Sequence, residues 1–440
     1  ILLFLFVLCI SIDAQNIVRY KDNIRTLIVE VNGEWDKPNV MLLNGEDYVR
    51  ISFDDLKHEY TRYSYTLKHC DANWEVSDLL ESEYMDGFNN NLIEGYEQSF
   101  NTKMEYNHYQ INIPNEDVKL LLPGNYCVEI FDEDEEELAA KCYFSVLEPR
   151  VVISAEVLGN TDVDTYKSHQ QIDFTINLLN YNIRNPHEEL KVVVTQNNRW
   201  DNAAVNIKPT YIQHNKLLYT HNRNLIFDAG NEFRRFEILD EYVPTMNVDK
   251  VEYIAPHYHA TLFTDEQRIN YIFDKDQNGK FWIRNSKNEL NETESEYFFT
   301  HFRIDMPQLQ NGDLYVCGDL TDNTFTESNK MEYDLLSHSY TSTLLLKQGS
   351  YNYQYLYVPN GETRGYTLDA EGNFHQTENV YNIYVYHKPF GERYDKLVGF
   401  HKKPLLFCLL RLRFTTRIIL FFAKCKRCRH KQQQQIFQCN

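Results

Sequence analysis

The sequence predicts an all-β protein built of tandem immunoglobulin-like or early-set-like β-sandwich domains. Aromatic residues are abundant and glycine is scarce, with 32 Tyr and 26 Phe against 16 Gly, and aromatic side chains favour the half-buried surface of a sheet. Short segments of β-forming residues recur along the chain, and helical periodicity is rare. The chain is 42% hydrophobic, so it can bury a substantial core.

The first predicted domain, an N-terminal β-sandwich, covers residues 15–149. Its expected strands alternate polar and apolar residues or run apolar, and they lie at 24–31, 49–53, 60–69, 106–113, 125–131 and 138–146. The last two strands flank an acidic run at 132–137 and should form a hairpin. Several short strands at this spacing are typical of a sandwich.

Two further sandwiches are predicted, a middle one at 150–294 and an early-set-like C-terminal one at 295–400. The middle domain should have strands at 151–157, 171–178, 190–196 and 258–263. A hairpin should join 269–273 to 280–284 around Asn278 and Gly279, since this dipeptide suits a tight turn. The C-terminal domain should have strands at 298–305, 313–316, 342–347, 351–358 and 382–386.

The two ends of the chain differ from this body. Residues 1–10 are an apolar run too short for a transmembrane helix, and Ala14 supplies a small residue for cleavage, so residues 1–14 are predicted to be a truncated signal peptide. Residues 401–440 hold ten Lys and Arg and no Asp or Glu. We predict that this basic tail is either non-native, through a frameshift or an assembly error, or disordered.

Charge and motifs limit the classes of function. The formal net charge of −20 argues against nucleic-acid binding, which needs a basic surface, and a mean hydropathy of −0.54 argues against a polytopic membrane protein. The body carries no motif of a serine hydrolase, a zinc protease or a phosphate-binding loop. We therefore predict binding rather than catalysis, with no catalytic residue, no metal ligand and no cofactor.

Two cysteines are candidates for a disulfide bond. If the hairpin turn is centred between Asp134 and Glu135, Cys127 lies opposite Cys142. Directly opposed cysteines can come close enough to bond, although such cross-strand bonds are strained. The alternative is that both are small buried hydrophobic residues.

A short acidic sequence copies the first half of a calcium loop. Asp274, Asp276, Asn278 and Gly279 have the spacing of that half, but the twelfth position is Asn285, where the loop needs a bidentate Glu. The sequence favours a hairpin turn over a calcium site.

Four tyrosines share one face of a predicted strand: Tyr351, Tyr353, Tyr355 and Tyr357. If exposed, they could stack on sugar rings or contact a partner protein. If buried, they belong to the core of the sandwich.

Several strings of residues together resemble one known family. They are ISFDDL at 51–56, YTLKHCDANW at 65–74, EYMDGF at 83–88, SFNT at 99–102, PGNY at 123–126, QNNRWDNA at 196–203, GNEFRRF at 230–236, LKQGSYNYQY at 346–355, QTEN at 376–379 and ERYDKLVG at 392–399. In these strings the chain is similar to the plug proteins of the type IX secretion system of Bacteroidota, over about residues 24–399. Residues 314–319 are also similar to the early-set sandwich of glycogen-binding modules, with Thr324 and Phe325 where those modules carry a Trp.

The resemblance implies a non-enzymatic, Sec-exported periplasmic protein at the inner face of the outer membrane. Its expected partner is the outer-membrane translocon barrel of the type IX system, which it would seal when no substrate is in transit, and it should be monomeric alone. The alternatives are a periplasmic carbohydrate-binding module, carried by the tyrosine-rich segment, and a glycan-processing enzyme with two carboxylates in a cleft. Within GNEFRRF, Asn231, Glu232 and Arg234 are expected to clamp strands by charge-assisted hydrogen bonds rather than to bind a partner.

Overall fold

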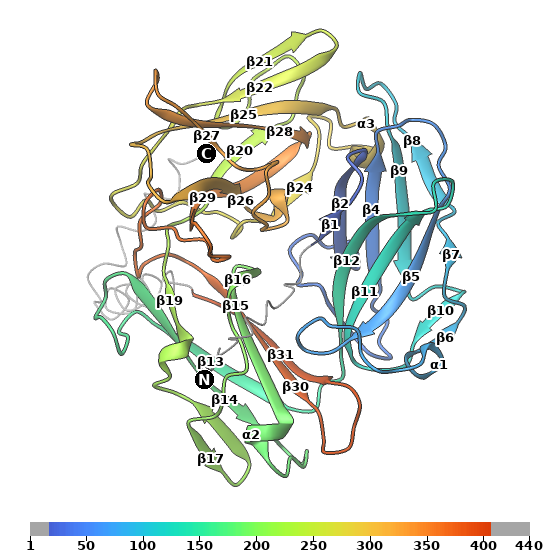
Figure 1. The fold of residues 1–440 in the computed structure, drawn as a ribbon, viewed down its shortest axis with the longest axis vertical. Coiled ribbons are helices and arrows are strands. Elements are labelled where there is room, and N and C mark those ends of the chain that lie inside the picture. The colour runs from blue at the N-terminus through green and yellow to red at the C-terminus, as the bar shows by residue number, and fades with distance from the viewer. Residues whose placement is uncertain (1–16, 406–440) are drawn as a thin grey trace, which may run out of the picture. The chain divides into compact units, whose positions relative to one another are not determined.

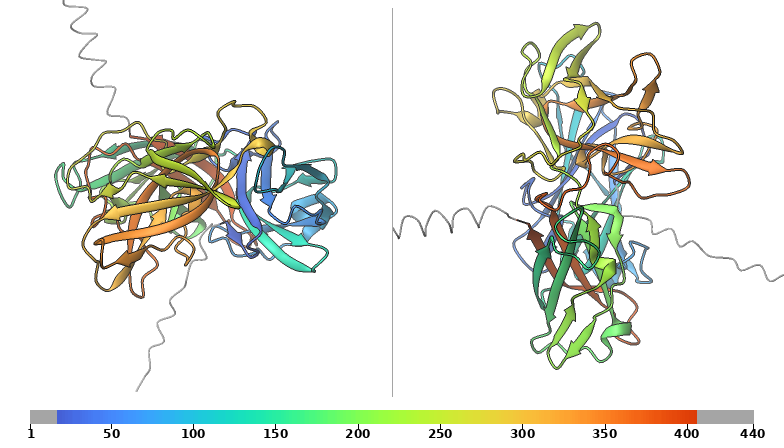
Figure 2. Two further views of the ribbon diagram at one scale, coloured as in Figure 1. Left: turned by 90° about the horizontal axis from the view of Figure 1, so that it is seen from above. Right: turned by 90° about the vertical axis from the view of Figure 1, so that its left-hand side faces the viewer.

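The structure is a computed structural model that describes residues 17–405. By its contacts the chain divides into two units, Ile1–Lys403 and Pro404–Asn440, and the fold is that of the first. Figure 1 traces its strands from the N-terminal sandwich onward, and Figure 2 shows them from two further sides. The described residues are nearly all β, in several separate sheets, which confirms the predicted class of tandem β-sandwiches.

The first sandwich is built by the strands before Leu147. One sheet has the order β1 (Val18–Arg19), β12 (Glu137–Leu147), β11 (Gly124–Asp132), β5 (Tyr63–Cys70), β7 (Asn91–Leu92), with β3 (Val40–Leu42) parallel to β12. The facing sheet has the order β2 (Ile24–Val31), β4 (Val49–Asp55), β9 (Asn107–Ile113), β8 (Gly95–Gln98). Helix α1 (Glu81–Tyr84) and the pair β6 (Met85–Gly87) and β10 (Val118–Leu120) complete it. Apolar side chains from both sheets meet in one buried core, as alternation along half-exposed strands requires.

The middle sandwich is completed by strands from the far end of the chain. One sheet has the order β13 (Val152–Leu158), β14 (His169–Asn177), β18 (Lys216–Tyr219), β17 (Tyr211–Gln213), with β19 (Ile226–Asp228) also on β14. The other has the order β16 (Arg199–Ala204), β15 (Leu190–Gln196), β30 (Val380–His387), β31 (Lys396–Pro404). Two short helices, α2 (Pro186–Glu189) and η1 (Arg223–Leu225), connect strands.

The third sandwich lies between these two parts of the sequence. One sheet has the order β20 (Arg234–Ile238), β29 (Gly349–Pro359), β24 (Phe281–Ile283), with β26 (Gly312–Cys317) also on β29. The other has the order β21 (Val248–Ile254), β22 (His257–Leu262), β25 (Tyr297–Asp305), β28 (Ser339–Lys347), β27 (Glu332–Asp334), with β23 (Asp265–Glu266) also on β25. The short helices are α3 (Asn291–Glu294) and η2 (Asp319–Thr321).

The sheets do not follow the predicted division at residue 294. Strands β20–β24, expected in the middle domain, belong to the sheets of the third sandwich, where β20 and β24 pair with β29 and β22 and β23 pair with β25. Strand β30, expected in the last domain, pairs with β15 over its whole length. When the chain leaves a sheet and returns to it much later, the residues around each strand do not show the pairing, because the two partners are far apart in the sequence. That the three predicted domains fold independently of one another stays a prediction.

Two local predictions need correction. Asn278 and Gly279 do form a turn with positive φ angles, but the hairpin is wrong: 269–273 is not a strand, and β24 pairs with β29 instead. Strand β31 continues to Pro404, so residues 401–404 are not part of a disordered tail. The predicted signal peptide at 1–14 and the tail from 406 onward lie outside the described residues. In the described part of the chain, no helix is long and apolar enough to cross a membrane.

Candidate functional site at the junction of the three sandwiches

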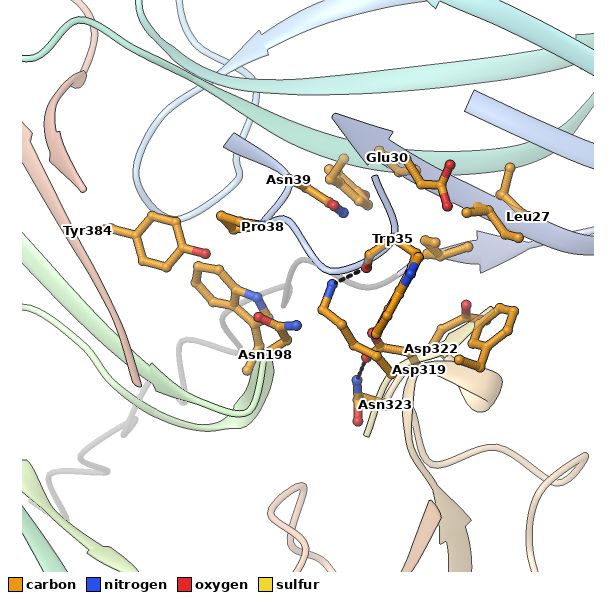
Figure 3. Close-up of a pocket in the computed structure, with 17 residues that line it drawn as sticks. Leu27, Glu30, Trp35, Pro38, Asn39, Asn198, Asp319, Asp322, Asn323 and Tyr384 are labelled. Carbon is orange, nitrogen blue, oxygen red and sulfur yellow. Dashed lines mark hydrogen bonds between the residues drawn. The ribbon is translucent and has the colours of Figure 1, made fainter. Parts of the chain in front are cut away.

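The three sandwiches meet around a cavity of about 140 Å³. The first sandwich contributes β2, β12 and the loop after β2, the middle one the turn after β15 and strand β30, and the third one β24 and η2 (Figure 3). Among the lining residues are Leu27, Glu30, Trp35, Pro38, Asn39, Tyr143, Asn198, Trp200, Lys280, Phe281, Asp319, Asp322, Asn323 and Tyr384. The cavity is thus aromatic and acidic, and every sandwich supplies part of its wall.

Tryptophan side chains join the sandwiches at this cavity. Trp35 of the first sandwich stacks on Trp282 of the third, with ring centroids 4.7 Å apart. Trp74 of the first sandwich packs edge-on against Trp200 of the middle one at 5.6 Å. All four tryptophans of the chain are therefore at contacts between sandwiches, where a large rigid ring buries much area at little entropic cost.

Lys280 anchors the loop that carries Trp35. Its Nζ donates hydrogen bonds to the carbonyl oxygens of Trp35 at 2.9 Å and Lys37 at 3.1 Å, and the first of these is drawn in Figure 3. The positive charge of Lys280 also stabilises the ionised form of Asp319, whose Oδ1 accepts a hydrogen bond from Asn323 at 2.7 Å. Burial nevertheless raises the pKa of Asp319, and Lys280 and Asn323 only oppose that rise.

Asp322 forms an ion pair between the first and third sandwiches. Its carboxylate binds the Arg19 guanidinium of β1, and its side chain is only 7% exposed. Burial raises the pKa of Asp322 to about 6, and Asp319 adds to the rise while Arg19 opposes it. Asp319 and Asp322 are thus engaged within the chain, and the third carboxylate of the cavity, Glu30, pairs with Arg50.

A second ionic joint links the first and third sandwiches away from the cavity. Asp54 of β4 accepts from Lys347 Nζ at 2.6 Å, from the Tyr297 hydroxyl at 2.6 Å, and lies 2.7 Å from Nδ1 of His108. The Asp54 and Lys347 side chains are each 1% exposed. Burial lowers the pKa of Lys347, whereas in Asp54 the effect of burial is outweighed by Lys347 and His108, which lower its pKa.

A third joint links the first and middle sandwiches through Asp395. Its Oδ2 accepts from the backbone N–H of Ala72 at 2.9 Å and from Lys191 Nζ at 2.7 Å. Its own N–H donates to Asp71 Oδ1 at 2.9 Å, and Asp71 also binds Lys388 at 3.2 Å. Both aspartates lie in strings that carried the family resemblance, so part of those strings serves to join domains.

The predicted disulfide geometry is wrong by one residue. A bulge between Ile130 and Phe131 shifts the hairpin, so Cys127 lies opposite Tyr143 and Cys142 lies opposite Val128. Because successive side chains of a strand alternate, the two cysteines point to opposite faces of the sheet. Both are buried free thiols in the structure, as in the alternative of two small hydrophobic residues.

The tyrosine-rich strand contributes to the core rather than to an open surface. Tyr351, Tyr353 and Tyr355 are each at most 3% exposed and pack in the core of the third sandwich. Tyr357 is partly buried, and its hydroxyl donates to the carbonyl oxygen of Gln310 at 2.6 Å. Three of the four predicted contact residues are therefore almost fully buried, because the strand turns this face inward.

The calcium-like sequence is occupied by interactions within the chain. Asp274 binds the Arg235 guanidinium at 2.5 Å, and Asp276 accepts hydrogen bonds from the backbone N–H groups of Phe233 and Asn278. Burial raises the pKa of Asp276 to about 6. Across residues 17–405 the structure contains no group of three or more His, Cys, Asp or Glu side chains that could hold a metal ion.

The GNEFRRF string is buried and clamps neighbouring segments. Arg234 binds Glu371 at 2.9 Å and Asp265 at 2.6 Å, and the Asn231 side chain donates to the carbonyl oxygen of Glu371 at 3.0 Å. Glu232 accepts from the Tyr271 hydroxyl at 2.6 Å, and burial raises the pKa of Glu232 to about 7. These contacts form the clamp between strands that the sequence predicts.

Sequence reasoning missed the cavity at the junction. Trp35, Lys280 and Asp322 lie in loops or short elements, without any spacing that marks a site. The one usable signal was the rarity of Trp, with four in 440 residues. A rare large aromatic outside a strand pattern often marks a contact between domains.

Comparison with known proteins places the chain in a family. Residues 24–148, which make up almost all of the first sandwich, match the family described as type 9 secretion system plug protein, first domain. The chain belongs to the type IX secretion system plug protein family. No curated protein matches the chain.

Solved structures include one relative with the same architecture. A hypothetical protein from Parabacteroides merdae is 42% identical, with a TM-score of 0.87, and the match covers 89% of this chain and all of that one. The C-terminal domain of the BspA polypeptide from Streptococcus agalactiae is 6% identical, with a TM-score of 0.17, over 86% of this chain and 100% of that one. Dimeric latent PorU from Porphyromonas gingivalis is 10% identical, with a TM-score of 0.15, over 87% of this chain and 34% of that one. The Parabacteroides merdae protein thus shares the fold of this chain.

Proposed function

We propose that the protein is a non-enzymatic periplasmic plug that seals the type IX translocon barrel in the outer membrane when no substrate is in transit. The observation that carries this proposal is the match of the first sandwich to the plug protein family. The protein acts by shape, as a single copy exported to the inner face of the outer membrane. It needs an interface of roughly 1,000 Å² or more rather than a catalytic group.

The joints between sandwiches support this proposal. A plug must keep its shape when it is held in a pore, and three sandwiches on flexible linkers would not. Here, ion pairs at Asp54 and Asp322, hydrogen bonds between Asp395 and the segment at Asp71 and Ala72, and packed tryptophans tie each sandwich to another. Truncating one partner of a pair buried on both sides, as Lys347 and Asp54 are, costs about 3–5 kcal/mol, so this joint resists opening.

The charge of the protein suggests the chemistry of the surface that it meets. With a net charge of −20, it would be drawn to a basic rim on the barrel, and like charges would repel it elsewhere. Attraction of this kind weakens as salt screens it, so binding should loosen at high ionic strength.

The direct test in cells is the permeability of the outer membrane. Deleting the gene should make the bacterium sensitive to antibiotics too large for its other pores, and a copy of the gene should restore resistance. A strain that also lacks the barrel is the control, because without the pore the plug has nothing to seal and the sensitivity should disappear. Unchanged permeability after deletion, or leakage that persists without the barrel, would contradict the proposal.

A further inference from the structure

A groove separate from the central tryptophans runs between the first and third sandwiches. It is lined on one side by residues of β1 and β2 and on the other by β28 and the segment after η2. Strands β1, β2 and β28 are labelled in Figure 1. Its volume is about 820 Å³, within the usual range for ligand sites. It shares only part of its wall, including Asp319 and Asp322, with the cavity at the junction.

The third sandwich presents a strand edge to this groove. Five consecutive residues of β28, 343–347, line it. Alternate side chains of a strand point to opposite faces of its sheet, so consecutive residues can share one groove only if it runs along the edge of the strand.

That edge is unpaired over the same residues. Strand β28 pairs with β25 along its whole length on one side, but on the other side β27 covers only Ser339, Tyr340 and Thr341. The edge from Ser342 to Leu346 therefore keeps backbone donors and acceptors without a strand partner among the described residues, whereas the carbonyl oxygen of Lys347 accepts from the Tyr351 hydroxyl. Such an edge is a template for adding an extended chain by backbone hydrogen bonds.

The facing wall carries a guanidinium that has no ion-pair partner among the described residues. Arg19 and Lys347 also line the groove, but they are paired with Asp322 and Asp54. Arg25 forms no ion pair with a described residue, although the carboxylate of Asp22, which also lines the groove, acts on its charge. Its Nη1 donates a hydrogen bond to the carbonyl oxygen of Ile24 at 3.2 Å. A half-buried guanidinium of this kind favours a carboxylate in the ligand, because charge-assisted hydrogen bonds are strong where water is scarce.

We propose that this groove binds an extended, acid-bearing segment of a partner protein. The segment adds a strand to the edge of β28, and a side-chain or terminal carboxylate of the segment meets Arg25. The groove thus recognises the partner's backbone through the strand edge and one of its charges through the arginine. The proposal does not depend on the plug function, because a peptide can occupy the groove without any barrel.

The test uses random short peptides displayed on phage and selected on the full chain. We expect selected sequences to carry Asp or Glu at one preferred position. A synthetic selected peptide should bind the Arg25→Gln variant about tenfold or more weakly, because the variant loses one charge-assisted contact. The matched control is Arg62→Gln, since Arg62 is an exposed arginine of the first sandwich that does not line the groove.

Two further arms separate strand addition from simple charge attraction. N-methylation of alternate backbone amides in the peptide should abolish binding in one frame and spare it in the other, because only every second amide of an added strand faces its neighbour. The Arg25→Glu variant should bind a peptide in which the acidic residue is replaced by Lys. The proposal is overturned if no sequence is enriched, if Arg25→Gln binds as well as the control, or if both methylated frames bind equally.

Discussion

At the scale of single residues, buried charges determine how firmly the sandwiches are held together. Lys347 has its ammonium group between Asp54 and the Tyr106 ring, whose centroid is 4.1 Å from Nζ. Replacing it with Met keeps the volume but leaves the Asp54 carboxylate buried without its main partner. We expect Lys347→Met to lower the free energy of unfolding by about 3–5 kcal/mol, measured by urea denaturation.

The exposed Lys119 provides the matched control, and Lys119→Met should leave the urea midpoint unchanged. Adding Asp54→Asn to Lys347→Met should recover part of the loss, because the second change removes the unpaired charge. Equal midpoints for Lys347→Met and Lys119→Met would show that the buried pair contributes nothing to the joint.

Glu232 should make stability depend on pH. Burial raises its pKa from 4.5 to about 7, so between these values the folded protein holds a proton that the unfolded chain has lost. Stability from this group is therefore full at low pH and falls as pH rises through that window. Glu232→Gln removes the titration, and at about pH 8 it should be more stable than the wild type by about 2–3 kcal/mol.

Thermal denaturation at several pH values measures this effect. The variant Glu97→Gln is the control, since Glu97 lies on the exposed strand β8 and should leave the pH profile of the wild type intact. A Glu232→Gln profile parallel to that of the wild type would show that this carboxyl is not the source of the slope.

At the scale of elements, the return of the chain to the middle sandwich makes a prediction about fragments. Strand β15 lies between β16 and β30 in its sheet, and a fragment of residues 150–294 lacks β30 and β31. We expect that fragment to show no cooperative unfolding by circular dichroism, because β15 loses its longer partner and exposes its apolar side chains.

A fragment of residues 150–403 is the comparison. It keeps all strands of the middle and third sandwiches, except for the last residue of β31, Pro404. It should unfold cooperatively. A cooperative transition in 150–294 alone would mean that the middle domain does not need the returning strands.

Local patterns predicted the strands well but not their partners. The expected strand at 24–31 is β2, and those at 106–113 and 190–196 differ little from β9 and β15. Alternation is a local property, so sequence shows it. The bulge at Ile130, which separates Cys127 from Cys142, and the pairing of β30 with β15 depend on tertiary packing, which no short window contains.

At the scale of the whole molecule, the candidate site was less predictable than the fold. The clamp at Asn231, Glu232 and Arg234 was expected, because side chains of these types can join strands by charge-assisted hydrogen bonds. The cavity at the junction was not, since its residues come from three sandwiches and share no spacing. The family resemblance rests on short strings of residues, and two of these strings contain Asp71 and Asp395. The hydrogen bond between these two aspartates joins the first and middle sandwiches.

The most direct measurement of the central claim is the ion current through the purified translocon barrel in a planar lipid bilayer. If the protein is a plug, adding it on the periplasmic side should close the open barrel in a concentration-dependent way, and high salt should weaken the block. Lys347→Met should block less well at equal concentration if the rigid joint matters. A current that stays unchanged at saturating wild-type protein would contradict the account.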